Sequence, residues 1–348
     1  MATQQDIKKA VSKGTAWLKE KQNPDGSFGS WDLGSTCLAV LALLHSRLDS
    51  MSPEIENAVA YIMNSSPPQS VHFRALTVMV LVAGKHKTPE TLDRVQSDIN
   101  WLIQAQCTDT GNNLSYGGWG PYGYDHTDGS NTQFALLALY AATFWSISVP
   151  YDTWQRTLSW YQNNHAVNKD GSFFYQTHEP TDLNNNQSTS CMTAAAFSGL
   201  KIINIFSKDE ANKIQVKKLI NNVQNWLENN YTYLYSNCSD DWHFYSLYSF
   251  KKGCVISPYT KLIGSHNWYD QISSHLLELQ KTDGSWMSGE DRKVTKIKDT
   301  VFALLTLSKE YVDNSEEYTG ENFKYTFMSN IACGIIRMNK HTICFRTK

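Results

Sequence analysis

The chain has 348 residues and a formal net charge of -2, with 31 Lys and Arg against 33 Asp and Glu. This balance gives no basic surface for nucleic acid and no polybasic stretch for an anionic membrane, so we expect neither as a partner. The longest apolar runs are helix-length pieces such as "CLAVLALL". They are far shorter than a membrane span, so we expect no transmembrane segment.

Cysteine usage indicates a reducing compartment. Seven cysteines are spread along the chain without a CxxC pair: Cys37, Cys107, Cys191, Cys238, Cys254, Cys333 and Cys344. An odd set without metal-type spacing predicts neither a zinc ribbon nor a disulfide framework. The N-terminus lacks the apolar segment of a secretory signal. We therefore expect a cytoplasmic protein, with export by a signal upstream of this sequence as the alternative.

One sequence unit recurs along the chain. In chain order, the copies with a clear loop are "WLKEKQNPDGSFGS…STCLAVLALL", "WLIQAQCTDTGNNLSYGGWG…SNTQFALLAL", "WYQNNHAVNKDGSFFY…STSCMTAAAFSGL" and "LLELQKTDGSWMSG…KDTVFALLTL". Each begins with an amphipathic helix that often ends near a Gln (Gln22, Gln106, Gln280), passes a glycine and aromatic turn, and enters an Ala- and Leu-rich helix. The unit is therefore predicted to be a helical hairpin.

Two further hairpins lack the glycine turn. They are "PEIENAVAYIMNSS…SVHFRALTVMVLVAG" and "IQVKKLINNVQNWLENN…DDWHFYSLYSF". Counting all copies gives six hairpins between about Asp6 and Lys309.

The two helices of a hairpin differ in their hydrophobic pattern. First helices such as "TLDRVQSDINWLIQAQ" carry an apolar stripe and a charged face, which is typical of an outer layer. Second helices such as "SCMTAAAFSGL" are apolar nearly all round, so they must be covered on most sides. Neither end hairpin has the polar cap that an open solenoid needs. We therefore expect an all-α fold, a six-hairpin α/α toroid of inner and outer helices. It forms one domain over residues 1–312, and the tail 313–348 is unassigned.

The turns between the helices suit a structural clamp. Asp25, Asp170 and Asp283 each begin an Asp-Gly-Ser-aromatic turn, in which the Asp side chain bonds backbone and the Gly supplies positive φ. We expect the aromatic residue to cover the end of the next hairpin.

These repeats resemble the QW-type repeats of the squalene cyclase and protein prenyltransferase β-subunit superfamily, whose members are α/α toroids. The segments "GGWG…SNTQFALLAL", "STSCMTAA", "DDWHFYSLYSF…GSHNWY" and "DGSW…DTVFALLTL" are most similar to bacterial proteins with prenyltransferase or squalene-oxidase repeats. The resemblance implies a terpenoid cyclase-like or prenyltransferase-like fold and an isoprenoid-type ligand.

The sequence motifs that catalysis requires in the families it resembles are incomplete. The cyclase D-x-D-D segment is absent, and the Asp-Asp pair Asp240-Asp241 stands where an inner helix should begin, which favours an ionised cap over a strong acid. "DHTD" (Asp125 to Asp128) has only the outer spacing of the magnesium motif D-D-x-x-D.

A zinc site of the prenyltransferase type is also incomplete. Such a site would use Cys191, Asp240 or Asp241, His243 and Asp299, but the Asp-x-Cys pair of that family is absent. We therefore expect no metal ligands, and neither zinc nor magnesium is firmly implied as a cofactor.

The long loop before the third inner helix is the best candidate for ligand contact. Ser130 and Asn131 suit a helix cap, but the extra segment "PYGYDHTD" is longer than the loop of hairpin one, and longer loops on one face of a repeat array often carry function. The loop before Ser188 is similar in kind. The expected ligand-binding residues are Trp119, Tyr122, Tyr124, Asp125, His126, Asp128, Tyr175, His178 and Trp242.

We expect an isoprenoid-handling protein, cyclase- or prenyltransferase-like, that binds an elongated apolar ligand in a central aromatic-lined cavity. Its candidate catalytic residues are Asp241, Asp240, His243 and Asp299. One alternative is a non-catalytic scaffold that binds a peptide, lipid or glycan at one mouth, with a protein partner as a further option. A third is a carbohydrate-active enzyme that pairs Asp125 or Asp128 with Glu179, Asp182 or Asp241 across an aromatic groove.

Overall fold

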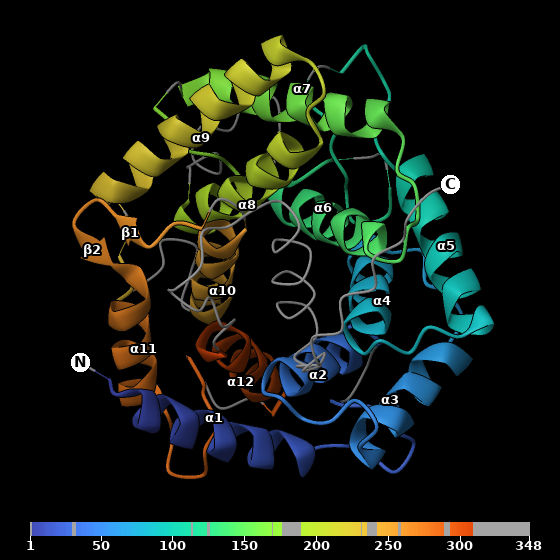
Figure 1. Cartoon of the computed structure of the whole chain (residues 1–348), viewed down its shortest axis with the longest axis vertical. Helices are drawn as coiled ribbons and strands as arrows, with labels where there is room; N and C mark the ends of the chain where they lie inside the picture. The colour runs from blue at the N-terminus through green and yellow to red at the C-terminus, as the bar shows by residue number, and fades with distance from the viewer. Residues whose placement is uncertain are drawn as a thin grey trace, which may run out of the picture.

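The computed structural model describes residues 2–29, 33–112, 114–123, 126–168, 170–175, 189–230, 232–234, 242–256, 259–288 and 293–308. Within these ranges the chain forms twelve helices and one two-stranded hairpin (Figure 1). The expected domain boundary at residue 312 and the tail 313–348 lie outside the described residues.

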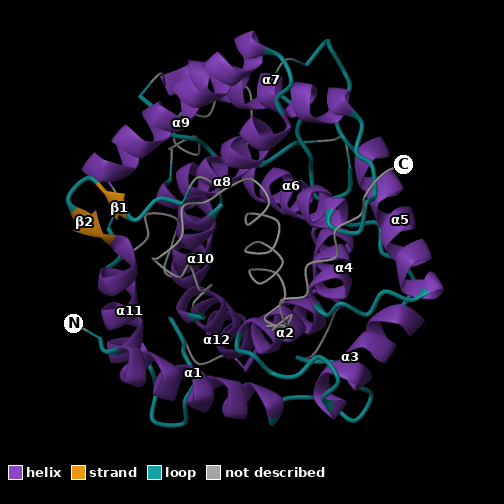
Figure 2. Ribbon diagram, in the orientation of Figure 1, coloured by secondary structure: helices purple, strands orange, loops and turns teal. Residues whose placement is uncertain are grey.

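The helices form two concentric rings, and odd-numbered helices make the outer one (Figure 2). The outer helices are α1 (Gln4–Lys19), α3 (Pro53–Asn64), α5 (Pro89–Gln104), α7 (Tyr151–Asn168), α9 (Glu210–Asn230) and α11 (Trp268–Leu279). The inner helices are α2 (Leu33–His45), α4 (Val71–Ala83), α6 (Gly129–Thr143), α8 (Ser190–Phe206), α10 (His243–Val255) and α12 (Lys293–Leu307). A short antiparallel pair, β1 (Leu262–Ile263) with β2 (His266–Asn267), precedes α11.

The inner ring is closed. Each inner helix packs against the next one in the chain, and α12 packs against α2. The outer helix α1 packs against both α11 and α12, so the two ends of the hairpin array meet (Figure 1). This closed arrangement confirms the predicted all-α toroid.

Burial separates the two layers as the hydrophobic patterns predict. In α5 the buried residues recur every three or four positions, from Thr91 through Val95 and Ile99 to Leu102. In α6 every residue from Gly129 to Ala142 is buried. A helix that is apolar all round is stable in water only when it is covered on most sides, and the inner helices α4 and α8 and the outer helix α5 pack against α6.

The repeat glutamines join neighbouring hairpins. The amide of Gln106 donates to the carbonyl of Gly117 in its own turn at 2.9 Å and to the carbonyl of Thr153 in the next outer helix at 3.0 Å. The other two repeat glutamines bond in the same way: Gln22 to Gly26 and Glu54, and Gln280 to Gly284 and Ala10. The turn is therefore a clamp between hairpins, as expected.

The turn glycines lie against the backbone of the next outer helix. Gly117 has φ 89°, and a Cβ atom there would lie 1.8 Å from the carbonyl oxygen of Arg156. Gly284 has φ 93°, and a Cβ atom would lie 2.7 Å from the carbonyl oxygen of Lys13 in α1. Only glycine allows both the left-handed backbone and this close approach.

The turn aromatics are tied to the inner helix that follows them. In the four glycine-turn hairpins the aromatic residue donates its backbone N–H to a threonine hydroxyl of that helix, at 3.0 to 3.1 Å: Phe28 to Thr36, Trp119 to Thr132, Phe173 to Thr193 and Trp286 to Thr300. This shared bond fixes these four inner helices relative to their turns.

The second hairpin, which lacks a glycine turn, is held by buried charges instead. Asp98 of α5 accepts from Arg74 of α4 at 2.7 Å and from Arg94 at 2.9 Å, and all three side chains are buried. Arg94 also donates to the carbonyl of Ser65 after α3 at 3.2 Å. Because every partner of such a triad is needed to offset the desolvation of the others, it links α3, α4 and α5 firmly.

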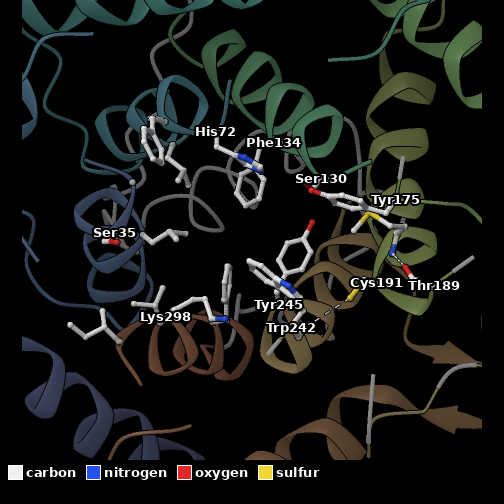
Figure 3. Close-up of a pocket in the computed structure, with 18 residues that line it drawn as sticks. Ser35, His72, Ser130, Phe134, Tyr175, Thr189, Cys191, Trp242, Tyr245 and Lys298 are labelled. Carbon is white, nitrogen blue, oxygen red and sulfur yellow. Dashed lines mark hydrogen bonds between the residues drawn. The ribbon is translucent and has the colours of Figure 1, made fainter. Parts of the chain in front are cut away.

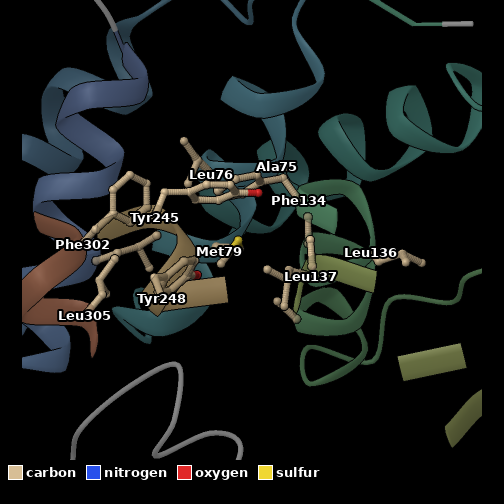
Figure 4. Close-up of a cluster of buried hydrophobic side chains, with 14 of the residues drawn as sticks. Ala75, Leu76, Met79, Phe134, Leu136, Leu137, Tyr245, Tyr248, Phe302 and Leu305 are labelled. Atoms are coloured by element: carbon tan, nitrogen blue, oxygen red, sulfur yellow. The ribbon is translucent and has the colours of Figure 1, made fainter. Parts of the chain in front are cut away.

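The core lies where the inner helices meet. Figure 4 shows buried side chains from α4, α6, α10 and α12 side by side, among them Met79, Leu137, Tyr248 and Leu305. In the part of the chain that the structure describes, no helix is long and apolar enough to cross a membrane.

Candidate functional site

The ring encloses a cavity of about 630 Å³. All six inner helices contribute to its lining, most of them near their N-terminal ends, such as Ser35 of α2, His72 of α4 and Ser130 of α6 (Figure 3). The helix α12 contributes residues from its middle. The size is that of a typical small-molecule site. One mouth of the toroid therefore carries the candidate site.

Aromatic side chains form one wall of the cavity. Phe134 of α6 stacks against Tyr245 of α10 with 6.3 Å between ring centroids, and Tyr245 lies 5.5 Å from Phe302 of α12. At the rim, Tyr175 and Trp242 are each 47% exposed, and Trp242 packs edge-to-face on Tyr245 at 6.0 Å. The wall is therefore a continuous series of aromatic rings from the buried interior to the solvent-exposed rim.

A buried polar network fixes Tyr245 in this wall. Its hydroxyl donates to the side-chain oxygen of Gln133 at 2.8 Å, and the Gln133 amide donates to Ser198 at 3.1 Å. Ser249 also donates to the Gln133 oxygen at 3.3 Å. Burial raises the pKa of Tyr245, so its hydroxyl stays protonated and keeps donating. The network ties α6, α8 and α10 together beneath the cavity.

His72 supplies a neutral polar group to the cavity wall. Its ring lies edge-on to Phe134 with 4.9 Å between centroids. Burial lowers the pKa of His72 to about 4, because the charged imidazolium is disfavoured away from water. At neutral pH the ring therefore offers one hydrogen-bond donor and one acceptor.

Lys298 is a cation in the lining, and Asp299 beside it has a structural role. The Lys298 ammonium lies 4.3 Å from the ring centroid of Trp242, a cation–π contact, and 3.8 Å from Oδ1 of Asp299. Oδ2 of Asp299 accepts from the backbone N–H and the hydroxyl of Ser288, both at 2.8 Å. Asp299, an expected catalytic residue, is thus buried outside the lining and holds the segment that precedes α12.

Asp128 is the cap of α6. Its carboxylate accepts from the backbone N–H of Asn131 at 2.8 Å, from the Asn131 amide and from the Ser130 hydroxyl. The expectation that Ser130 or Asn131 caps this helix is therefore corrected: both donate to the cap. Burial raises the pKa of Asp128, and these hydrogen bonds oppose the shift. Asp128 lies next to the cavity through Ser130, which lines it.

The other expected ligand residues fall into three groups. Trp119 is fully buried and donates its indole N–H to the carbonyl of Leu102 at 2.7 Å, so it belongs to a clamp and offers no face to a ligand. Tyr122 is 82% exposed, and His126 is exposed with φ 50°. The rest of the expected ligand residues lie outside the described residues: Tyr124, Asp125 and His178. So do the expected carboxylates of the catalytic and carbohydrate-active hypotheses: Glu179, Asp182, Asp240 and Asp241.

His243 begins α10 but is not in the cavity lining. Its Nε2 lies 3.1 Å from Nε2 of His275 in α11, and the two rings are perpendicular. Burial lowers the pKa of His275, because the charged imidazolium is disfavoured away from water. Within the described ranges no cluster of three or more His, Cys, Asp or Glu side chains is arranged for a metal ion.

One cysteine departs from the expected absence of disulfides. Cys191 of α8 is disulfide-bonded, whereas Cys37, Cys107 and Cys254 are free and buried. Its partner is therefore none of these three cysteines. Cys191 also lines the cavity, and a disulfide there excludes the thiolate that a zinc site at this residue would need.

Sequence reasoning missed most of the lining. His72, Phe134, Tyr245 and Lys298 all face the cavity but were not among the expected site residues. Their signal in the sequence is weak: a polar or aromatic residue in or near the first turn of an otherwise apolar helix.

Comparisons with known proteins were made by sequence and by structure. A scan against protein-family models and a search of curated protein sequences give no match. Among solved structures, the chain is similar to an α-1,6-mannanase of glycoside hydrolase family 76 from Salegentibacter sp., with 7% identity and a TM-score of 0.65 over 87% of this chain and 98% of that one. It is also similar to a possible member of family GH105 from Salmonella enterica, with 9% identity and a TM-score of 0.58 over 88% of this chain and 94% of that one.

These similarities identify the fold as the α/α toroid that the helix pattern predicts. They also correct the expected relation to terpenoid cyclases, squalene cyclase and prenyltransferases, because these two neighbours are a glycoside hydrolase and a possible member of a glycoside hydrolase family. A ring of hairpins supports unrelated chemistries, so a repeat that builds the ring identifies the fold and not the reaction.

Proposed function

We propose that this protein is carbohydrate-active and binds an oligosaccharide in the central cavity. The observation that carries the proposal is the aromatic wall, which ends at the half-exposed rings of Tyr175 and Trp242. A pyranose ring has an apolar C–H face that packs flat on such rings, and burial of that face is favourable.

The polar groups of the lining suit sugar hydroxyls. Neutral His72 offers a donor and an acceptor, Ser35 and Ser130 offer hydroxyls, and Lys298 offers donors. A few directed polar groups within an aromatic pocket are the usual pattern of a specific small-molecule site. Each sugar ring presents both kinds of surface, which is why this combination favours a glycan over a purely apolar ligand.

The structural neighbours support the same class of ligand. An inactive variant of the mannanase, with two aspartates replaced by alanine, is solved in complex with α-1,6-mannotetrose, at 8% identity and a TM-score of 0.62 to this chain. At this identity the likeness concerns the fold alone, so it supports the proposal only together with the cavity.

Glycoside cleavage is the reaction that we propose for the bound glycan. Such reactions use two carboxyl groups on either side of the scissile bond. Asp241 stands directly before the lining residue Trp242 in the sequence, and Asp240 precedes it. We therefore keep Asp241 and Asp240 as the proposed catalytic carboxylates.

Binding is tested by isothermal titration of a panel of oligosaccharides that includes α-1,6-mannotetraose. We expect at least one glycan to bind, and Trp242→Ala to weaken its binding by about tenfold, the change that ~1.4 kcal/mol produces. The matched control is Tyr259→Ala, since Tyr259 is an exposed aromatic beyond the opposite end of α10. If no glycan binds, or if both variants lose affinity equally, the proposal is wrong.

Cleavage is tested separately with Asp241→Asn. We expect this variant to bind the glycan as the wild type does and to release no reducing ends from it. Unchanged turnover in Asp241→Asn would remove that residue from the proposed mechanism and leave the binding proposal intact.

A further inference from the structure

Three aromatic side chains stand exposed on consecutive hairpins of the ring. Tyr122 lies before α6, Tyr175 before α8 and Trp242 before α10, with exposed fractions of 82%, 47% and 47%. We call them the rim aromatics. Tyr175 and Trp242 line the cavity, whereas Tyr122 does not.

Tyr122 is held at the mouth that carries the cavity. Gly120 and Gly123 pair across it, with the Gly120 N–H donating to the Gly123 carbonyl at 2.7 Å. The carbonyl of Pro121 accepts from the N–H of Val71, the first residue of α4, at 3.0 Å. The next residue of α4 is His72, which lines the cavity. The ring of Tyr122 is therefore presented on a backbone-fixed turn beside the cavity wall.

The other two rim aromatics also contact neighbouring inner helices, Tyr175 through its backbone and Trp242 through its side chain. The carbonyl of Tyr175 accepts from the N–H of Gly129, the first residue of α6, at 2.9 Å. Trp242 occupies the cap position of α10 and contacts Lys298 of α12. Each aromatic therefore bridges from its own hairpin to an adjacent inner helix, and the three follow the rim over hairpins three, four and five.

We propose that the rim aromatics form a track for a glycan chain that continues out of the cavity, with Tyr122 as its outermost contact. The inference rests on the proposed function, since it names the length of glycan that the same site takes. Tyr175 and Trp242 contact sugar rings inside the cavity, and Tyr122 contacts a sugar ring of the same chain outside it. The site therefore selects an oligosaccharide or polysaccharide chain over a single sugar or a disaccharide.

The experiment compares chain lengths at fixed chemistry. Affinities of α-1,6-linked mannose oligomers and β-1,4-linked glucose oligomers, from disaccharide to hexasaccharide, are measured for the wild type, Tyr122→Ala and Tyr259→Ala. We expect wild-type affinity to rise with length. Tyr122→Ala should leave disaccharide binding unchanged and weaken hexasaccharide binding by about tenfold, the equivalent of ~1.4 kcal/mol. Because Tyr122 is exposed, the variant should fold normally, which its thermal unfolding checks.

The outcomes separate the track from the function. If glycans bind but Tyr122→Ala affects short and long oligomers alike, or neither, the track does not exist and the binding proposal stands. If wild-type affinity is the same at every length, the track is likewise excluded. If no oligomer of either series binds the wild type, the proposed glycan binding and the proposed track are both wrong.

Discussion

The side-chain amide of Gln280 donates to the backbone carbonyl of Ala10 at 2.9 Å, although the two residues are 270 positions apart. Gln22 and Gln106 make the same bond to the outer helix that follows them in the chain. The sixth hairpin therefore contacts the first as the other hairpins contact the next one in the chain. The same glutamine hydrogen bond joins neighbouring hairpins and closes the ring.

Loss of the Gln280 amide should destabilise the closed ring. Gln280→Ala removes bonds to Ala10 and Gly284 and leaves two carbonyl groups without these donors. We expect a decrease of about 1–3 kcal/mol in the free energy of unfolding, measured by urea denaturation. Glu278→Ala, at an exposed position of the helix α11 that precedes Gln280, is the control and should change it by less than about 0.5 kcal/mol. Equal effects would show that the contact at the junction is not important for stability.

The clamp glycine Gly117 should tolerate no side chain. Gly117→Ala combines φ 89° with a Cβ atom 1.8 Å from the Arg156 carbonyl oxygen, so α7 would have to move. We expect a loss of more than about 2 kcal/mol, seen as a lower Tm. Gly111→Ala lies in the same loop, where the new methyl group meets only the end of the Asp109 side chain at 3.1 Å. A variant at Gly117 as stable as that at Gly111 would contradict the close approach.

His72 should make the folded protein sensitive to acid. Its pKa is lowered from 6.5 to about 4 by burial. Between these values the unfolded chain binds a proton at this residue that the folded chain does not, so the free energy of unfolding decreases as the pH falls. His72→Gln removes this contribution. The Tm of the wild type should therefore fall relative to the variant between pH 7 and pH 4.5, and a constant difference between the two would refute the burial of a neutral imidazole.

The disulfide at Cys191 predicts a pattern of thiol labelling. In denaturant without reductant, iodoacetamide should label Cys37, Cys107 and Cys254, which are free, but not Cys191. Prior reduction should add label at Cys191, as read from peptide masses. Labelling of Cys191 in the unreduced protein would mean that this thiol is free in solution.

The sequence predicts the residues at the rim of the site better than those of the cavity wall. Trp242 was expected as one aromatic of a glycan groove, and Tyr122 and Tyr175 were expected because long loops precede the inner helices at their positions. Trp119 was expected for the same reason and is instead a buried clamp, because the sequence does not distinguish an aromatic that faces solvent from one that fills a turn. The catalytic expectation for Asp240 and Asp241 stays a prediction.

The sequence by itself determined the hairpins and their turns, because these depend on helical periodicity within each segment and on turns that only glycine allows. The tertiary structure decided which side of each inner helix faces the cavity. In α6, buried from Gly129 to Ala142, no periodic change from apolar to polar residues marks the face of Phe134 as the lumen. An amphipathic helix shows its orientation in its sequence, but a helix covered on every side does not. His72, Phe134 and Tyr245 became a site only when the ring closed and brought the six inner helices around one cavity.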